Sequence, residues 1–74
     1  MIETRKQISE CFKLLEKVEP MVDFEDLCAI ARRNYGIKPN EVQAWSADMQ
    51  LKEKIKSAYV GSKYFVARKN NVKL

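Results

Sequence analysis

The sequence predicts a single, mostly helical domain of three or four helices, and three observations lead to this fold class. Apolar residues recur at steps of three and four along most of residues 8–49, which is the spacing of one face of a helix. Glycine and proline occur only twice each, at positions that flank these apolar stripes. The 74 residues suffice for one domain of roughly 3–5 kcal/mol net stability. We expect the domain to cover residues 1–68, followed by a flexible basic tail over residues 69–74.

The first helix is expected from about Glu3 to Lys17. Its apolar stripe consists of Ile8, Cys11, Phe12, Leu15 and Val18. Pro20 ends the helix, because proline disfavours helical geometry in the residue before it. Cys11, and Cys28 further along, fall on apolar helical faces, so we expect both thiols to be buried and reduced.

The second helix is expected to begin after Asp23, whose carboxylate can accept hydrogen bonds from free backbone N–H groups. Glu25 and Asp26 follow in the first turn, where the helix dipole favours negative charge. The buried stripe is expected to consist of Phe24, Leu27, Cys28, Ala31 and Tyr35. Gly36 is expected to end this helix in the left-handed conformation.

The third helix is expected to start near Pro39 or Asn40, since proline is favoured at the first position of a helix. Val42, Trp45 and Met49 form its inward face, and the apolar phase then shifts to Leu51, Ile55 and Ala58 or Tyr59. Two interpretations stay open. The favoured one is a continuous or mildly kinked helix, and the other is a break near residues 46–48 followed by a fourth helix.

The last segment has two interpretations as well. Tyr64, Phe65 and Val66 have strand composition, and Gly61-Ser62 suits a two-residue turn with glycine at the position that needs positive φ. A short C-terminal β-hairpin over residues 57–67 is one interpretation. In the other, the long helix ends at Gly61 and leaves one short strand or extended arm.

Positive charge is concentrated in the C-terminal half of the chain. Residues 1–37 carry six Lys/Arg and seven Asp/Glu, whereas residues 38–74 carry eight and three, within a net charge of +4. This asymmetry indicates an anionic partner, with nucleic acid first and an acidic protein second. The alternative is a solvated surface that only keeps a small protein in solution.

Residues 27–45 resemble the helix-turn-helix of small phage or mobile-element DNA-binding proteins and of transposase N-terminal domains. Gly36 takes the turn position that needs unusual backbone geometry, and Ile37 follows as an apolar plug. Val42 and Trp45 have the spacing at which the second helix of the motif packs on the first. The chain departs from the pattern at Arg32, where a small residue is usual, and at Lys38, where Ser or Thr usually caps the helix.

The resemblance implies that the helix starting at Pro39 enters the major groove. Its outward residues would be Asn40, Gln43, Ala44 and Ala47, of which Asn and Gln can pair with adenine and Ala can meet a thymine methyl. Arg33 and Lys38 would lie near phosphates. Further phosphates would be neutralised by Lys52, Lys54, Lys56, Lys63, Arg68 and Lys69. A C-terminal hairpin would resemble the wing of winged-helix proteins, with Lys63 near its tip.

The sequence argues against catalysis. It contains no histidine, which is the commonest general base and metal ligand, and it has no glycine-rich phosphate loop. The acidic residues Asp23, Glu25 and Asp26 suit a helix start better than a metal site. We therefore expect no catalytic residues, no metal and no cofactor, a cytoplasmic location, and no membrane partner, since no stretch of 18 apolar residues exists.

Two functions follow as hypotheses. The first is a small basic protein that binds duplex DNA as a transcription regulator or recombination accessory factor, with homodimerisation left open. The second is a non-enzymatic protein–protein module, such as a phage-encoded inhibitor or adaptor that binds a host protein. Trp45 separates them: its burial between helices, with Gln43 and Ala44 in solvent beside lysines, favours DNA binding. Burial of Gln43 and Ala44, with an exposed apolar patch near Met49, Tyr59 or Phe65, favours the protein–protein module.

Overall fold

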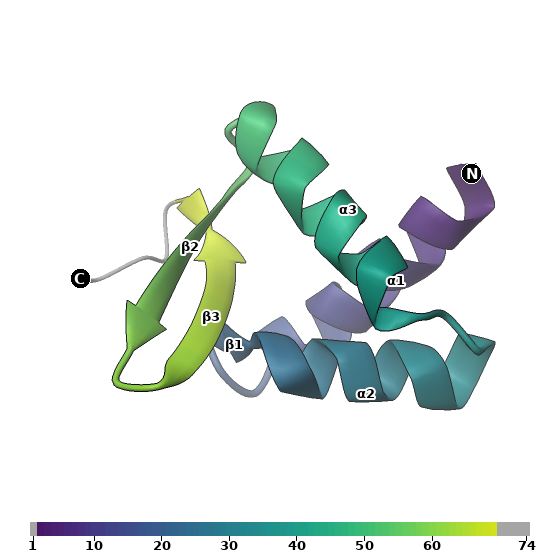
Figure 1. Ribbon diagram of the computed structural model, residues 1–74, viewed down its shortest axis with the longest axis horizontal. Helices are drawn as coiled ribbons and strands as arrows, with labels where there is room; N and C mark the ends of the chain where they lie inside the picture. The colour runs from purple at the N-terminus through teal and green to yellow at the C-terminus, as the bar shows by residue number, and fades with distance from the viewer. Residues whose placement is uncertain (1, 70–74) are drawn as a thin grey trace.

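The fold combines three helices with a three-stranded antiparallel sheet (Figure 1). A computed structural model describes residues 2–69. In chain order the elements are α1 (Ile2–Glu16), β1 (Val22–Asp23), α2 (Phe24–Tyr35), α3 (Pro39–Leu51), β2 (Ile55–Val60) and β3 (Lys63–Arg68). The expected mostly helical domain of three or four helices is therefore corrected to a mixed one, and no fourth helix is present among residues 2–69.

The ends of α2 and the start of α3 confirm the predictions from local sequence. Asp23 caps α2, and its Oδ1 accepts a hydrogen bond of 3.0 Å from the Glu25 backbone N–H. Gly36 follows α2 with φ of 66°, and its N–H donates to the Arg32 carbonyl, which closes the helix in the left-handed manner. Pro39 is the first residue of α3. Local capping chemistry thus determines where these helices begin and end.

The end of α3 contradicts both predictions for the third helix. Glu53 adopts a φ of 57°, the Lys54 N–H donates to the Met49 carbonyl and the Glu53 N–H to the Gln50 carbonyl. These two bonds form a Schellman motif, with Glu53 in the position that usually holds glycine. The positions that would continue its buried face beyond Met49 hold Lys52, Glu53 and Lys56. Because these side chains are charged, a longer helix would bury no further apolar surface. The missing glycine explains why local sequence did not predict this end.

β2 and β3 form the C-terminal hairpin, which confirms that interpretation of the last segment and lengthens it at both ends. Val60 pairs with Lys63 across the two-residue turn, and Gly61 has a φ of 64°, as the first central position of a type II′ turn requires. β1 pairs with β3 on its other edge, with Val22 opposite Val66. β1 was not predicted, since two residues carry no readable alternation.

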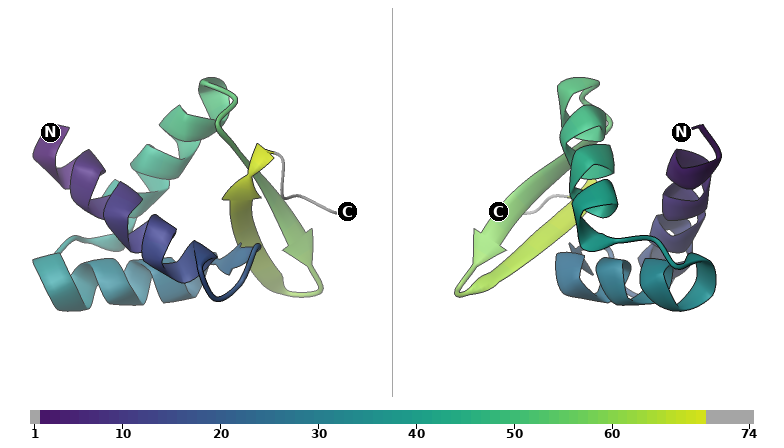
Figure 2. Two further views of the ribbon diagram at one scale, coloured as in Figure 1. Left: turned by 180° about the vertical axis from the view of Figure 1, so that it is seen from behind. Right: turned by 45° about the vertical axis from the view of Figure 1, so that its right-hand side comes forward.

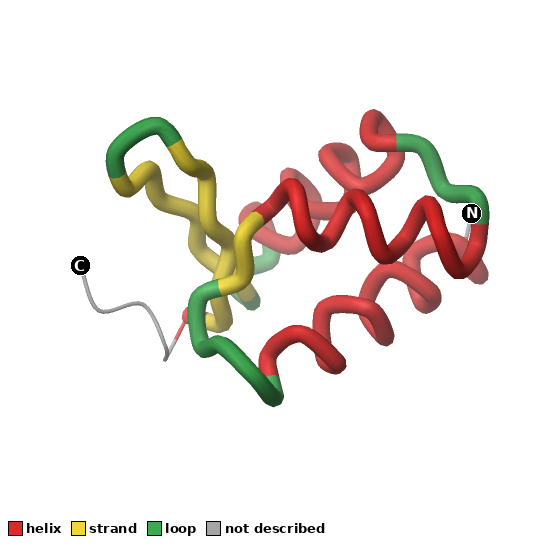
Figure 3. Tube along the Cα trace, turned by 90° about the horizontal axis from the view of Figure 1, so that it is seen from below, coloured by secondary structure: helices red, strands yellow, loops and turns green. Residues whose placement is uncertain are grey.

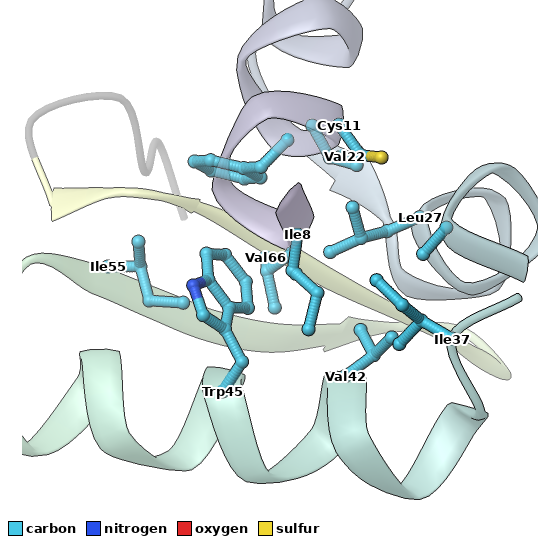
Figure 4. Close-up of a cluster of buried hydrophobic side chains, with 11 residues drawn as sticks. Ile8, Cys11, Val22, Leu27, Ile37, Val42, Trp45, Ile55 and Val66 are labelled. Atoms are coloured by element: carbon cyan, nitrogen blue, oxygen red, sulfur yellow. The ribbon is translucent and has the colours of Figure 1, made fainter. Parts of the chain in front are cut away.

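The core lies between the helices and one face of the sheet (Figure 4). Its fully buried side chains include Ile8, Leu27, Val22, Val42, Val66 and Cys11. Two residues expected in the apolar stripes lie outside it: Val18 is 85% exposed, because α1 has ended before it, and Tyr35 is 42% exposed. Both cysteines are free, and Cys11 is buried whereas Cys28 is only half-buried.

The helices and the hairpin occupy different sides of the molecule (Figure 3). In the right-hand view of Figure 2, α3 stands between the hairpin on one side and α1 on the other. Within residues 2–69 no helix has the length and apolar character needed to cross a membrane. The basic tail expected over residues 69–74 lies outside the described residues, apart from Lys69.

Candidate functional site

Side chains on one face of α3 fix the orientation of this helix. Val42 is 0% and Trp45 2% exposed, and the Trp45 ring lies 5.5 Å from that of Phe12 on α1, centroid to centroid. The indole Nε1 donates a hydrogen bond of 3.0 Å to Ser9 Oγ. Because Trp45 is held by both packing and a directional bond, the opposite face of α3 must point to solvent.

That opposite face carries four residues at steps of four, three and four, which we call the outer ridge of α3. The ridge consists of Asn40, Ala44, Ala47 and Leu51, all exposed. None of them is charged, and the two central side chains are single methyl groups. The ridge is therefore slim and neutral, and any surface that meets it can approach the backbone of α3 closely.

A groove separates α3 from the hairpin, and we call it the hairpin groove. It has a volume of about 570 Å³ and is lined by Phe24, Gln43, Ser46, Ala47, Gln50, Ser57, Tyr59 and Tyr64. This described lining contains no charged side chain, only hydroxyl groups, amides, a methyl group and aromatic rings. The groove can therefore donate hydrogen bonds to an anion without repelling it.

Gln50 connects α3 to β2 and β3 through hydrogen bonds at the floor of this groove. Its Nε2 donates to Ser46 Oγ at 3.1 Å and, less closely, to Tyr64 Oη at 3.4 Å. Its Oε1 accepts a bond of 3.0 Å from Ser57 Oγ. Since Ser57 lies on β2 and Tyr64 on β3, one amide sets the position of the hairpin relative to α3.

Both acidic residues of α3 lie on the flank that faces α1. Glu41 and Ala44 line a shallow groove together with Arg5 of α1, and Asp48 forms ion pairs with Arg5 and with Lys52, the latter at 3.2 Å. The hydrogen bond from Lys52 and the charge of Arg5 hold the pKa of Asp48 below its ordinary value of 3.8. The negative charge of α3 is thus neutralised or turned away from the hairpin groove.

The structure does not bring the predicted phosphate-binding residues onto one surface. Arg33 and Lys38 lie on either side of the turn between α2 and α3, and both are exposed. Lys56 and Lys63 occupy register positions on the sheet face opposite the core, with Lys63 next to the hairpin turn. Arg33 and Lys38 thus lie near the start of the ridge, whereas Lys56 and Lys63 lie on the hairpin.

Three other predicted cations are held in ion pairs elsewhere. Lys52 pairs with Asp48, and Lys69 with Glu53 at 3.2 Å. Arg68 Nε donates to both carboxylate oxygens of Glu16 at the end of α1, at 2.8 and 2.7 Å. Lys63 also has a partner, Asp23, but at 3.8 Å and with the lysine side chain 65% exposed. Position in the sequence could not distinguish cations used within the fold from those facing solvent.

Three groove residues were missed by the sequence analysis. Tyr59, which the sequence sets on the shifted apolar phase of a continued helix, lies on β2 and is 73% exposed, and its ring lies 4.8 Å from that of Tyr64, centroid to centroid. Ser57 and Gln50 were not singled out at all. The alternation of Ile55, Ser57 and Tyr59 on one face of a strand was the available signal, and it was obscured by the assumption that the helix continued.

The two free cysteines lie in surroundings that disfavour the thiolate. Burial raises the pKa of the Cys11 thiol and of the Cys28 thiol, with a further rise from Glu10 and from Glu25 respectively. Both thiols are therefore poor nucleophiles at neutral pH. Within the same residues, no three cysteine or carboxylate side chains gather where a metal ion could bind.

Comparisons with protein families, with curated proteins and with solved structures gave no match to this chain.

Proposed function

We propose that this protein binds duplex DNA without catalysing a reaction, as a small transcription regulator or recombination accessory factor does. The observation that carries the proposal is the division of α3 into unlike faces. Its outer ridge is exposed, and neither the ridge nor the hairpin flank carries an acidic side chain, whereas Glu41 and Asp48 face α1. A helix that enters a polyanionic groove needs this division, because an acidic leading face would be repelled.

The arrangement of neighbouring elements supports the same function. A hairpin directly follows the helix of the proposed motif, at the position of the wing in winged-helix proteins. The turn between α2 and α3 and the turn of the hairpin lie on opposite sides of the view in Figure 1. Arg33 and Lys38 at one side and Lys63 at the other would therefore contact phosphates on either side of the bound helix.

The helix-turn-helix resemblance gains a physical basis from the α2–α3 contact. Ala31, one position before Arg32, is a small residue buried in the core with 0% exposure, while Arg32 lies in solvent. The departure at Arg32 therefore does not prevent close packing of α2 against α3. The departure at Lys38 remains, since its side chain makes no capping hydrogen bond to α3.

A salt titration tests the proposal directly. Fluorescence anisotropy of a labelled duplex of about 20 base pairs, two helical turns, would give the binding constant at increasing NaCl concentration. We expect the logarithm of the constant to fall linearly with the logarithm of salt concentration, as counterions are released from neutralised phosphates. Binding that is undetectable at low salt, or indifferent to salt, would overturn the proposal.

A protein–protein module is the second candidate, and exposed apolar side chains favour it. Leu51 is 84%, Tyr59 73% and Val60 48% exposed. Single exposed apolar residues are normal on soluble proteins, so these carry less weight than the division of α3. Pull-down from lysate with and without nuclease separates the candidates: a partner that is retained after nuclease treatment but no longer captured by Tyr59→Ser would favour the module.

A further inference from the structure

We infer that α3 selects DNA sites rich in A·T base pairs, through thymine methyl groups and adenine edges in the major groove. This inference rests on the proposed function and adds the class of sequence that the same surface reads. It follows from the side chains of α3 that are not used in contacts within the fold and can therefore contact DNA.

Contacts within the protein occupy the inner face and part of both flanks of α3. Val42, Trp45 and Ser46 are buried, Gln50 is bonded to residues of the hairpin, and Asp48 is paired with Arg5 and Lys52. The exposed side chains on the ridge and on its hairpin flank are Asn40, Gln43, Ala44, Ala47 and Leu51. Leu51 is the last residue of the helix, so the first four are the candidates for contacts to base edges.

These four side chains match adenine and thymine better than guanine and cytosine. An Asn or Gln amide donates to adenine N7 and accepts from its N6 amine, and an alanine methyl packs on the thymine methyl. Guanine presents two acceptors in the major groove, N7 and O6, so an amide oxygen would face an acceptor there. The residues that commonly select guanine are Arg and Lys, and the helix from Pro39 to Leu51 contains neither.

The spacing within α3 places one amide and one methyl in each of two rows. Asn40 and Ala44 form one row, and Gln43 and Ala47 the other, four residues apart in each case. Four residues rise about 6 Å along a helix, which is close to two base-pair steps of about 3.4 Å. Each row can therefore meet an adenine on one base pair and a thymine methyl on a nearby pair.

Four duplexes of equal length and charge test the inference. They contain alternating A·T pairs, alternating G·C pairs, A·T pairs with deoxyuridine in place of thymidine, and inosine·cytosine pairs. Deoxyuridine removes only the major-groove methyl. Inosine·cytosine resembles A·T in the minor groove but G·C in the major groove, since inosine lacks only the N2 amine of guanine. The set therefore separates the two grooves chemically.

We expect A·T duplexes to bind at least about tenfold more tightly than G·C duplexes, the value of one good bidentate contact. Deoxyuridine should weaken binding about threefold to fourfold for each thymine methyl that an alanine would otherwise cover, and inosine·cytosine should bind as G·C does. Equal binding of A·T and G·C overturns the inference, and so does inosine·cytosine that binds as A·T does. Salt-dependent binding in these two cases leaves the proposed function intact, whereas no binding to any duplex overturns both.

A substitution on the exposed side of α3 provides a second test of the inference. Gln43→Ala should reduce the A·T preference about tenfold, with little effect on G·C binding. Gln7→Ala on α1, which lines a different surface with Glu10 and Tyr35, is the matched control and should keep the preference. Loss of affinity for A·T and G·C alike in Gln43→Ala would contradict a role in base selection.

Discussion

Trp45 on α3 donates its indole hydrogen bond to Ser9 on α1, two residues that are 36 positions apart. The bond lies on the inner side of α3, where Trp45 also packs against Phe12. In Figure 4 the Trp45 ring extends from α3 into the cluster that holds Ile8 and Val66. Helix α3 is thus tied to α1 as well as to α2, and its outer ridge takes its direction from this anchor.

Ser9→Ala should lower the free energy of unfolding by about 1–3 kcal/mol, because it leaves a buried indole N–H without a partner. The same substitution in a Trp45→Phe background should cost clearly less, since no N–H remains. Urea unfolding of the four proteins in this double-mutant cycle measures the coupling and cancels the helix propensity of alanine. Equal costs in the two backgrounds would show that the bond contributes nothing.

Glu53→Gly should raise the free energy of unfolding by about 0.5–1 kcal/mol, since glycine adopts positive φ without steric cost. The ion pair with Lys69 that it removes is exposed, with the Glu53 side chain 77% accessible, and contributes little. Lys52→Gly, at a φ of −82°, is the control and should destabilise the fold by about 0.5–1 kcal/mol. If both substitutions destabilised the protein, the helix end would not be controlled by the Glu53 conformation.

Gln50→Ala should loosen the hairpin more than the helices. It removes the bonds to Ser57 and Tyr64 that connect α3 to β2 and β3. Amide hydrogen exchange is the measurement, and protection should fall mainly in residues 55–66, because local opening depends on local contacts. A uniform loss of protection that includes α1 and α2 would indicate general destabilisation instead.

Asp48 should contribute to the pH dependence of stability. The pKa of its carboxyl is lowered in the folded state, first by the Lys52 hydrogen bond and then by Arg5. A lowered pKa gives stability that is present above the unfolded pKa of about 4 and is lost as pH falls through the folded value. The urea midpoint of the wild type should therefore fall more steeply than that of Asp48→Asn between about pH 5 and pH 2.

High salt is the control for the Asp48 experiment. Both partners are substantially exposed, with Arg5 49% and Lys52 57% accessible, so about 1 M NaCl should reduce the difference between the two proteins. A difference that persists unchanged in high salt would point to a cause other than these ion pairs.

Lys63→Ala and Arg68→Ala should affect different measurements. Lys63 has a long and exposed ion pair, so its removal should reduce the salt dependence of duplex binding by about one phosphate contact with little change in unfolding. Arg68 is committed to Glu16 through two close contacts, and its loss should lower the free energy of unfolding by about 1 kcal/mol. The salt slope of Arg68→Ala should equal that of the wild type.

The reverse pattern, with Arg68→Ala reducing the salt slope and Lys63→Ala leaving it unchanged, would place the bound phosphates at the base of the hairpin. Lys17→Ala, at an exposed position directly after α1, controls for the loss of one positive charge anywhere on the surface.

Much of the fold was predictable where one residue suffices to determine local geometry. Asp23, Gly36 and Pro39 place the α2–α3 segment because capping, left-handed φ and a missing N–H are properties of those residues themselves. The outward face of α3 followed from the inward one, since Val42 and Trp45 fix the phase of a regular helix. The exposure of Asn40, Gln43 and Ala44 was predictable for that reason, whereas their proposed contacts to bases come from the resemblance to helix-turn-helix proteins.

The end of α3 and the use of the cations were not predictable in this way. Glu53 takes the left-handed conformation without being glycine, and the two-residue strand β1 exists only because β3 offers it an edge. Local sequence does not distinguish Arg68 and Lys69 from other basic residues, because their ion-pair partners Glu16 and Glu53 come from distant parts of the chain.

The sequence by itself therefore determined the helix starts, the helical phase and the excess of positive charge, because these depend on neighbours within one or two turns. Only the tertiary structure decided that α3 turns its acidic flank toward α1, that Gln50 joins it to the hairpin, and which cations remain exposed. These features depend on contacts between residues far apart in the chain, whose formation is governed by the packing of the whole core around Trp45.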